Sequence, residues 1–201
     1  MIITSIVPFD NKRSKVRLDN GTDLCLYKGE IRKLHIEEGL EITDEIFQLI
    51  CDDILTPRCR SRALHLLEKQ DRTESNLRNK LLEGGHIEAC IEDAIQYCKD
   101  YGYVDDERYA RNYITFHQNN RSRQRLKQDL YGKGVPSSLI DICLDEYFDA
   151  DELGQIKELL RKRHYDAENA TYEERSKQYR FLRGKGYSND AVNRALSIYD
   201  E

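Results

Sequence analysis

Three carboxylates stand in a row near the middle of the chain, in the stretch KDYGYVDDERYARNYI. Asp105, Asp106 and Glu107 could form a general acid–base pair or part of a metal site, because both need carboxylates held close together. Either chemistry also needs a histidine or further carboxylates at the same place, and the sequence predicts none there. The alternative is that Asp105 caps a helix and the next two acids meet its positive end. We therefore expect neither catalysis nor a metal here.

The residues after Asp105 have the period of a helix. Tyr109, Tyr113 and Phe116 fall at i, i+4 and i+7, which predicts an aromatic stripe facing the core. Glu107 and Arg111 are spaced for an i, i+4 ion pair.

Composition points to a helical protein with thin cores. Of the 201 residues 34% are charged and 39% hydrophobic, with no tryptophan. The net charge of −5 argues against a general phosphate binder, so any nucleic-acid contact needs a local basic patch. The N-terminus has a short apolar run but no long h-region or small-residue cleavage site, and no apolar stretch approaches the roughly 18 residues of a membrane span. We therefore expect no signal peptide, and a cytoplasmic protein without a membrane partner.

The six cysteines do not have the spacing of a metal site. They form no CxxC pair and lack histidines at zinc-ligand spacing. We expect reduced thiols that pack as small hydrophobic side chains.

Residues 1–56 predict a small N-terminal module. Apolar and charged residues alternate on both sides of Asn20-Gly21, a pair that favours a tight hairpin turn, and the segment IITSIV can add a third strand. A helix follows, with Thr43 as its N-cap, and Thr56-Pro57 ends this piece and opens the next helix.

Residues 57–201 contain one helical unit three times, at about 57–100, 103–148 and 149–201. Each copy has an upstream helix and then a glycine, Gly85, Gly134 or Gly186, at the point where a helix must stop. A left-handed conformation there favours glycine. Six, nine and ten residues after each glycine, apolar residues mark one helical face. We predict a mainly α fold of three tandem three-helix repeats, packed into an elongated, curved, solenoid-like body.

Three stretches carry a family resemblance: RALHLLEKQDRTESNLRNKL, then YGYVDDERYARNYI, then RSRQRLKQDLYGKGV. In type and order they closely resemble the RecX family of bacterial RecA modulators, over about residues 58–201. The resemblance implies three tandem three-helix repeats, and a protein that lies in the groove of the RecA–DNA filament and limits recombination and coprotease activity. The third repeat departs from the pattern at Gln178, where the first two have Leu77 and Leu126, and the N-terminal module is not part of the minimal family pattern.

Two basic clusters are the candidate contact surfaces. The second repeat has one amphipathic helix with basic side chains on its exposed side, and the third repeat has a second cluster. Arginine favours binding of phosphates or an acidic protein surface, whereas the alternative is a solvated face. The partner-binding candidates are Arg121, Arg123, Arg125, Lys127, Lys133, Arg180, Arg183 and Lys185.

The sequence thus favours a non-enzymatic, monomeric regulator of a recombinase filament, with no cofactor. The alternative is a stand-alone nucleic-acid-binding protein, which would bind DNA through local basic patches without RecA. A metal-dependent nuclease based on Asp105 and Asp106 lacks a third ligand.

Overall fold

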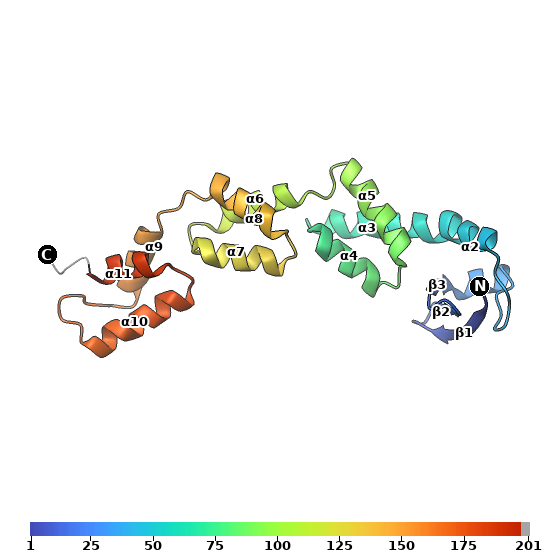
Figure 1. Cartoon of the computed structure of the whole chain (residues 1–201), viewed down its shortest axis with the longest axis horizontal. Helices are drawn as coiled ribbons and strands as arrows, with labels where there is room; N and C mark the ends of the chain where they lie inside the picture. The colour runs from blue at the N-terminus through green and yellow to red at the C-terminus, as the bar shows by residue number, and fades with distance from the viewer. Residues whose placement is uncertain (198–201) are drawn as a thin grey trace. The chain divides into compact units, whose positions relative to one another are not determined.

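The computed structural model describes residues 1–197 and forms two compact units, residues 1–105 and the residues from 106 onward (Figure 1). The first unit contains β1 (Ile3–Pro8), β2 (Arg13–Leu18), β3 (Asp23–Tyr27), α1 (Lys28–Lys33), α2 (Asp44–Ile50), α3 (Thr56–Lys69), α4 (Glu74–Glu83) and α5 (Glu88–Asp100). The second contains α6 (Asp106–His117), α7 (Arg123–Gly132), α8 (Ser137–Tyr147), α9 (Glu152–Lys162), α10 (Tyr172–Gly184) and α11 (Asn189–Ser197). The fold is mainly helical, with three tandem three-helix repeats after a small β module, as the sequence predicts.

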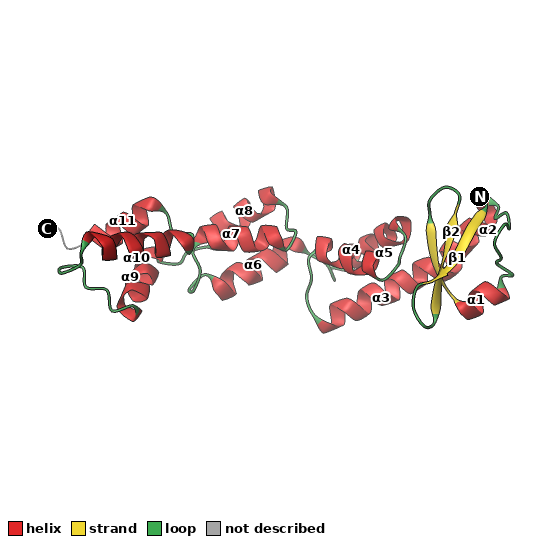
Figure 2. Ribbon diagram, turned by 90° about the horizontal axis from the view of Figure 1, so that it is seen from below, coloured by secondary structure: helices red, strands yellow, loops and turns green. Residues whose placement is uncertain are grey.

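The three strands form an antiparallel sheet in the order β1-β2-β3 (Figure 2). Val16 on the central strand faces Ile6 on one side and Leu24 on the other. The turn between β2 and β3 contains the expected Asn20-Gly21 pair, with Gly21 at φ 86°. The predicted hairpin and its third strand are both confirmed.

The helical backbone continues without a break through residue 56, where the sequence suggested a boundary. A π-helical turn (Cys51–Leu55) joins α2 to α3, and Leu55 and Thr56 keep right-handed helical angles. Pro57 lies in the first turn of α3 and has no N–H for the carbonyl four residues earlier. The wider π turn just before it accommodates that missing donor. The proline changes the local helical pitch instead of ending the helix.

The N-terminal module and the first repeat share one hydrophobic core. Its members include Leu24 and Leu26 of β3 together with Leu77 and Leu81 of α4, all fully buried. Polar contacts join the same parts, since the Arg13 guanidinium donates to the Gly84 carbonyl at 2.9 Å. The module therefore completes the core of the first repeat.

Each repeat ends its middle helix with the same turn. Gly85, Gly134 and Gly186 have φ values of 81°, 83° and 89°, as the spacing predicts. The next N–H in each copy donates to the carbonyl five residues earlier, in the pairs His86–Leu81, Val135–Leu130 and Tyr187–Leu182, at 3.2, 3.2 and 3.3 Å. This is the Schellman arrangement, which satisfies carbonyls that the helix end would leave without donors.

The buried face of α6 differs from the predicted aromatic stripe. Ala110 and Ile114 are fully buried, whereas Phe116 is 78% exposed. Tyr109 and Tyr113 pack only partly against the core. The 3.6-residue period allows two neighbouring stripes here, and the smaller side chains occupy the side that faces α8, against which α6 packs.

The second and third repeats keep separate hydrophobic clusters. One lies among α6, α7 and α8 and includes Leu126 and Leu130; the other lies among α9, α10 and α11 and includes Leu182 and Val192. Among the described residues of the second unit, these two repeats therefore share no hydrophobic core.

Gln178 occupies the core position where the other repeats have leucine. It is 8% exposed, and its side-chain oxygen accepts a hydrogen bond from the Arg163 guanidinium at 2.7 Å. The same guanidinium lies 4.1 Å from the centre of the Phe181 ring. The third repeat thus replaces an aliphatic contact by a polar pair stacked on an aromatic ring.

The thiols are buried and unlinked. All six cysteines are free, and burial raises the pKa of Cys51 to about 11 and that of Cys59 to about 12. Both thiols therefore stay protonated near neutral pH. Among residues 1–197 no helix combines the length and apolar character that crossing a membrane requires.

Candidate functional site

The three adjacent acids, Asp105, Asp106 and Glu107, lie at the start of α6. Asp105 directly precedes the helix, and Asp106 and Glu107 occupy its first turn. That placement suits the predicted cap, and the capping hydrogen bond itself stays a prediction. Within residues 1–197 no three His, Cys, Asp or Glu side chains are grouped as metal ligands would be.

Hydrogen bonds join the second repeat to the third. We call the contact between Ser122 and Lys185 the clasp. Ser122 is the N-cap of α7, where its hydroxyl oxygen accepts the Arg125 N–H at 3.2 Å. The same hydroxyl donates to the carbonyl of Lys185, in the turn after α10, at 2.9 Å. Gly186 permits this approach, because a Cβ there would lie 2.7 Å from the Ser122 oxygen. A second contact runs from the Arg123 N–H to the Glu152 carboxylate at 2.8 Å.

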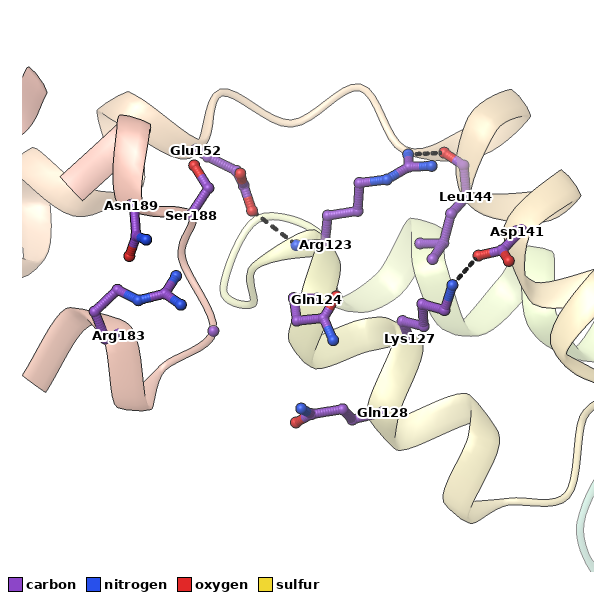
Figure 3. A pocket seen from close by; sticks show the side chains of 11 residues that line it. Arg123, Gln124, Lys127, Gln128, Asp141, Leu144, Glu152, Arg183, Ser188 and Asn189 are labelled. Atoms are coloured by element: carbon purple, nitrogen blue, oxygen red, sulfur yellow. Dashed lines mark hydrogen bonds and ion pairs between the residues drawn. The ribbon is translucent and has the colours of Figure 1, made fainter. Parts of the chain in front are cut away.

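One groove opens beside this clasp, with a volume of about 790 Å³ (Figure 3). We call it the Arg183 groove; its charged lining consists of Arg123, Lys127, Asp141, Glu152 and Arg183. Lys127 pairs with Asp141. The Arg123 guanidinium donates to the Leu144 carbonyl at 2.6 Å and pairs with Asp145. Acids therefore offset most of the positive charge in this groove.

A second groove, of about 630 Å³, also borders the clasp. We call it the Lys185 groove; its charged lining consists of Arg121, Arg125, Arg180 and Lys185, and no carboxylate lines it. Arg121 and Arg125 share one acid, Asp129, which is 13% exposed and lies behind them. Asp129 pairs with Arg125 at 3.2 Å. The Lys185 groove therefore keeps an excess of positive charge.

The structure brings together seven of the eight predicted contact residues. The clusters of the second and third repeats, far apart in the sequence, line two grooves that both border one contact. Lys133 is the exception, because its ammonium lies 5.1 Å from the centre of the Tyr113 ring and it lines neither groove.

The basic helix is not the bare stripe that the sequence suggested. Arg121, Arg123, Arg125 and Lys127 all pair with acids, which lie on α7 itself or on α8. Helical spacing alone predicts the pairing with Asp129, but Asp141 and Asp145 come close only once α8 folds back along α7. The pairs made by Arg123 and Lys127 are exposed, so they contribute little to stability.

Sequence reasoning did not find the residues that hold the two repeats together. Ser122 reads as one more polar residue between two arginines, and Glu152 as an ordinary first-turn acid. A signal existed: Thr73 and Ser122 each stand four residues before the core leucines Leu77 and Leu126, and both cap their helices. No sequence signal predicts the contact between Ser122 and Lys185, because it depends on how the third repeat packs.

The remaining cations of the third repeat lie outside the grooves. Arg161 and Lys162 both pair with Glu158, and these neighbours lower the pKa of that carboxyl to about 2. This part of the cluster is a solvated surface.

Comparison with known proteins decides the family. Models of the first, second and third three-helix domains of RecX match residues 59–98, 105–144 and 150–196. The "Regulatory protein RecX" of Clostridium perfringens (strain SM101 / Type A) is 33% identical over 175 residues, which cover 84% of this chain and 78% of that protein. This chain belongs to the RecX family. The "Regulatory protein RecX" of Vibrio campbellii (strain ATCC BAA-1116) is 35% identical over 144 residues, or 71% of this chain and 92% of the relative.

Solved RecX structures share the fold. One crystal structure of regulatory protein RecX aligns over 100% of this chain with a TM-score of 0.66 at 24% identity. The crystal structure of RecX from Lactobacillus salivarius aligns over 72% of this chain with a TM-score of 0.64 at 23% identity. The first alignment includes the N-terminal module.

Proposed function

We propose that this chain binds the RecA–DNA filament and limits its recombinase and coprotease activity in DNA repair. One observation carries the proposal: the basic clusters of two repeats meet at a single clasp and line the two grooves that border it. Membership of a family of regulatory proteins supports it. The proposed role implies a monomeric cytoplasmic protein that acts by binding.

The local charge explains how an acidic protein can bind a polyanionic filament. The chain carries a net charge of −5, which repels DNA at long range. Within about a Debye length, roughly 8–10 Å, the nearby cations dominate the field instead. A partner must therefore place phosphates or carboxylates directly against the basic surface. Its own protein surface must not repel the rest of this chain, which is acidic.

The test is binding to cognate RecA, with and without single-stranded DNA, followed by a filament disassembly assay. The variant replaces Arg125, Lys127, Arg180 and Lys185 by glutamine. We expect filament binding to weaken at least about tenfold, or about 1.4 kcal/mol, and the residual binding to depend less on salt.

A matched control loses the same charge elsewhere. It replaces Lys12, Lys28, Arg32 and Lys33, four exposed cations of the first unit, by glutamine. Equal losses in both variants would show that net charge, and not this surface, governs binding. Wild-type binding by the groove variant across a salt series would overturn the proposed surface, and DNA binding that is equally tight without RecA would favour the stand-alone nucleic-acid-binding alternative.

A further inference from the structure

The two grooves differ in what they can bind. This difference rests on the proposed function and assigns a partner to one part of the same surface. The Arg183 groove has Asp141 and Glu152 in its lining, so phosphates entering it meet negative charge. The Lys185 groove has four cations and no carboxylate in its lining.

The cations of the Lys185 groove are available to a ligand. Arg125 is 53% exposed, and Arg180 and Lys185 are exposed as well. Arg121 is held by Asp129 and by the Tyr113 hydroxyl at 2.9 Å, which fixes its position beside the other cations. One carboxylate behind four cations leaves a surplus of positive charge toward the opening.

The aromatic side chains of this groove are already in contact with neighbouring side chains. The Phe181 ring has the Arg163 guanidinium at 4.1 Å and the Lys185 ammonium at 5.6 Å from its centre. Tyr187 is 2% exposed and donates its hydroxyl hydrogen to the side-chain oxygen of Gln155 at 2.9 Å. A nucleobase stacks on an exposed ring face, which Tyr187 does not offer. At Phe181 a base would have to compete with the two cations for the ring.

We propose that the Lys185 groove binds the phosphate backbone of nucleic acid, by charge alone and without reading bases, and that the Arg183 groove does not. The clasp between Ser122 and Lys185 holds the cations of the two repeats at a fixed separation. A phosphate chain presents charges at regular short intervals, which two cations on each wall can contact together. Affinity then depends on salt and not on base identity.

The test uses the purified full-length protein without RecA and measures fluorescence anisotropy of thymidine and deoxyadenosine homopolymers across a salt series. The groove variant is Arg180→Gln with Lys185→Gln. We expect affinity at low salt to fall about tenfold or more, and the slope of log affinity against log salt to decrease by about one to two. Wild-type protein should bind the two homopolymers within about twofold of each other, because no base stacks.

Two controls keep the proposal falsifiable. Lys127→Gln with Arg183→Gln removes two charges from the Arg183 groove, and we expect less than about a threefold loss and an unchanged salt slope. Arg180→Lys with Lys185→Arg keeps the charge, and should bind like wild type, which separates charge from folding.

The outcomes distinguish this inference from the proposed function. Loss of homopolymer binding in the Lys185-groove variant, with RecA binding kept when DNA is absent, supports the division between the grooves. An equal loss in the Arg183-groove control overturns it, and so does a preference of about tenfold or more for one homopolymer. Failure to bind RecA alone contradicts the proposed function and leaves the homopolymer result standing.

Discussion

The contact between the N-terminal module and the first repeat is apolar, whereas the contact between the second and third repeats is polar. In the first case β3 and α4 contribute fully buried leucines to one core. In the second case the hydrophobic clusters are separate and the link consists of hydrogen bonds, including the Gln155 amide donating to the Gln118 carbonyl at 2.6 Å. Shared core makes two parts fold as one, while a hydrogen-bonded seam leaves water-accessible space beside it. The difference explains why grooves form at the second contact.

The largest effect should come from a leucine in the shared core. Leu26→Ala removes a fully buried side chain and should cost about 2–5 kcal/mol in chemical denaturation. Hydrogen exchange should rise in α3 and α5 as well as in the sheet, because the core is common. Leu182→Ala should cost a similar amount but raise exchange in α9, α10 and α11 only. Equal loss of protection in α6 and α8 would mean that the second and third repeats unfold as one unit.

A change at the clasp should have the next largest effect. Gly186→Ala combines the strain of a left-handed residue, about 1–3 kcal/mol, with a Cβ placed 2.7 Å from the Ser122 oxygen. Gly134→Val, at the equivalent turn of the second repeat, should cost more than about 1 kcal/mol, because a β-branched residue resists this conformation. Urea denaturation measures both. Wild-type stability of Gly134→Val would contradict the repeat boundary.

The equivalent turns should also respond differently to pH. Burial, with Arg13 and Arg58 nearby, lowers the pKa of His86 from 6.5 to about 4, so the unfolded chain binds more protons between those values. The stability from neutral His86 is present above pH 6.5 and is lost as the pH falls toward 4. We expect a loss of about 1–2 kcal/mol, allowing for the partial exposure of the ring.

His86→Gln is the matching control for this pH dependence. Denaturation of both proteins at pH 7 and pH 4.5 should show a smaller loss in the variant. At the clasp, burial raises the pKa of Tyr187, the equivalent residue, to about 12, which keeps it neutral over this whole range. An identical pH dependence in both proteins would show that His86 protonation is not linked to folding.

Substitution of Asp105, which precedes α6, should have the smallest effect on stability. Asp105→Ala should cost about 1 kcal/mol and Asp105→Asn almost nothing, because asparagine caps a helix about as well as aspartate. Thermal denaturation tests the pair. A metal-dependent activity lost in Asp105→Asn, with the fold intact, would rule against the capping interpretation.

Local rules predicted most of the fold, and long-range packing decided the rest. The Asn20-Gly21 turn, the three left-handed glycines and the Thr43 cap of α2 follow from backbone chemistry within a few residues. Phe116 was assigned to the wrong side of α6, because periodicity alone does not choose between adjacent stripes. The basic candidates were found by composition. Their acidic partners on α8 and their meeting at the clasp depend on contacts between helices, which no local pattern encodes.

The Ser122 hydroxyl makes two hydrogen bonds in two different repeats, one as acceptor and one as donor. It holds the first turn of α7 and also the turn that enters α11. If that first turn frays, the donor to Lys185 moves away, and if the third repeat withdraws, the cap loses its neighbour. Opening of one helical turn and release of the following repeat are then a single event. A ligand that orders the start of α7 would slow that release, so the lifetime of the contact would report on occupancy of the grooves.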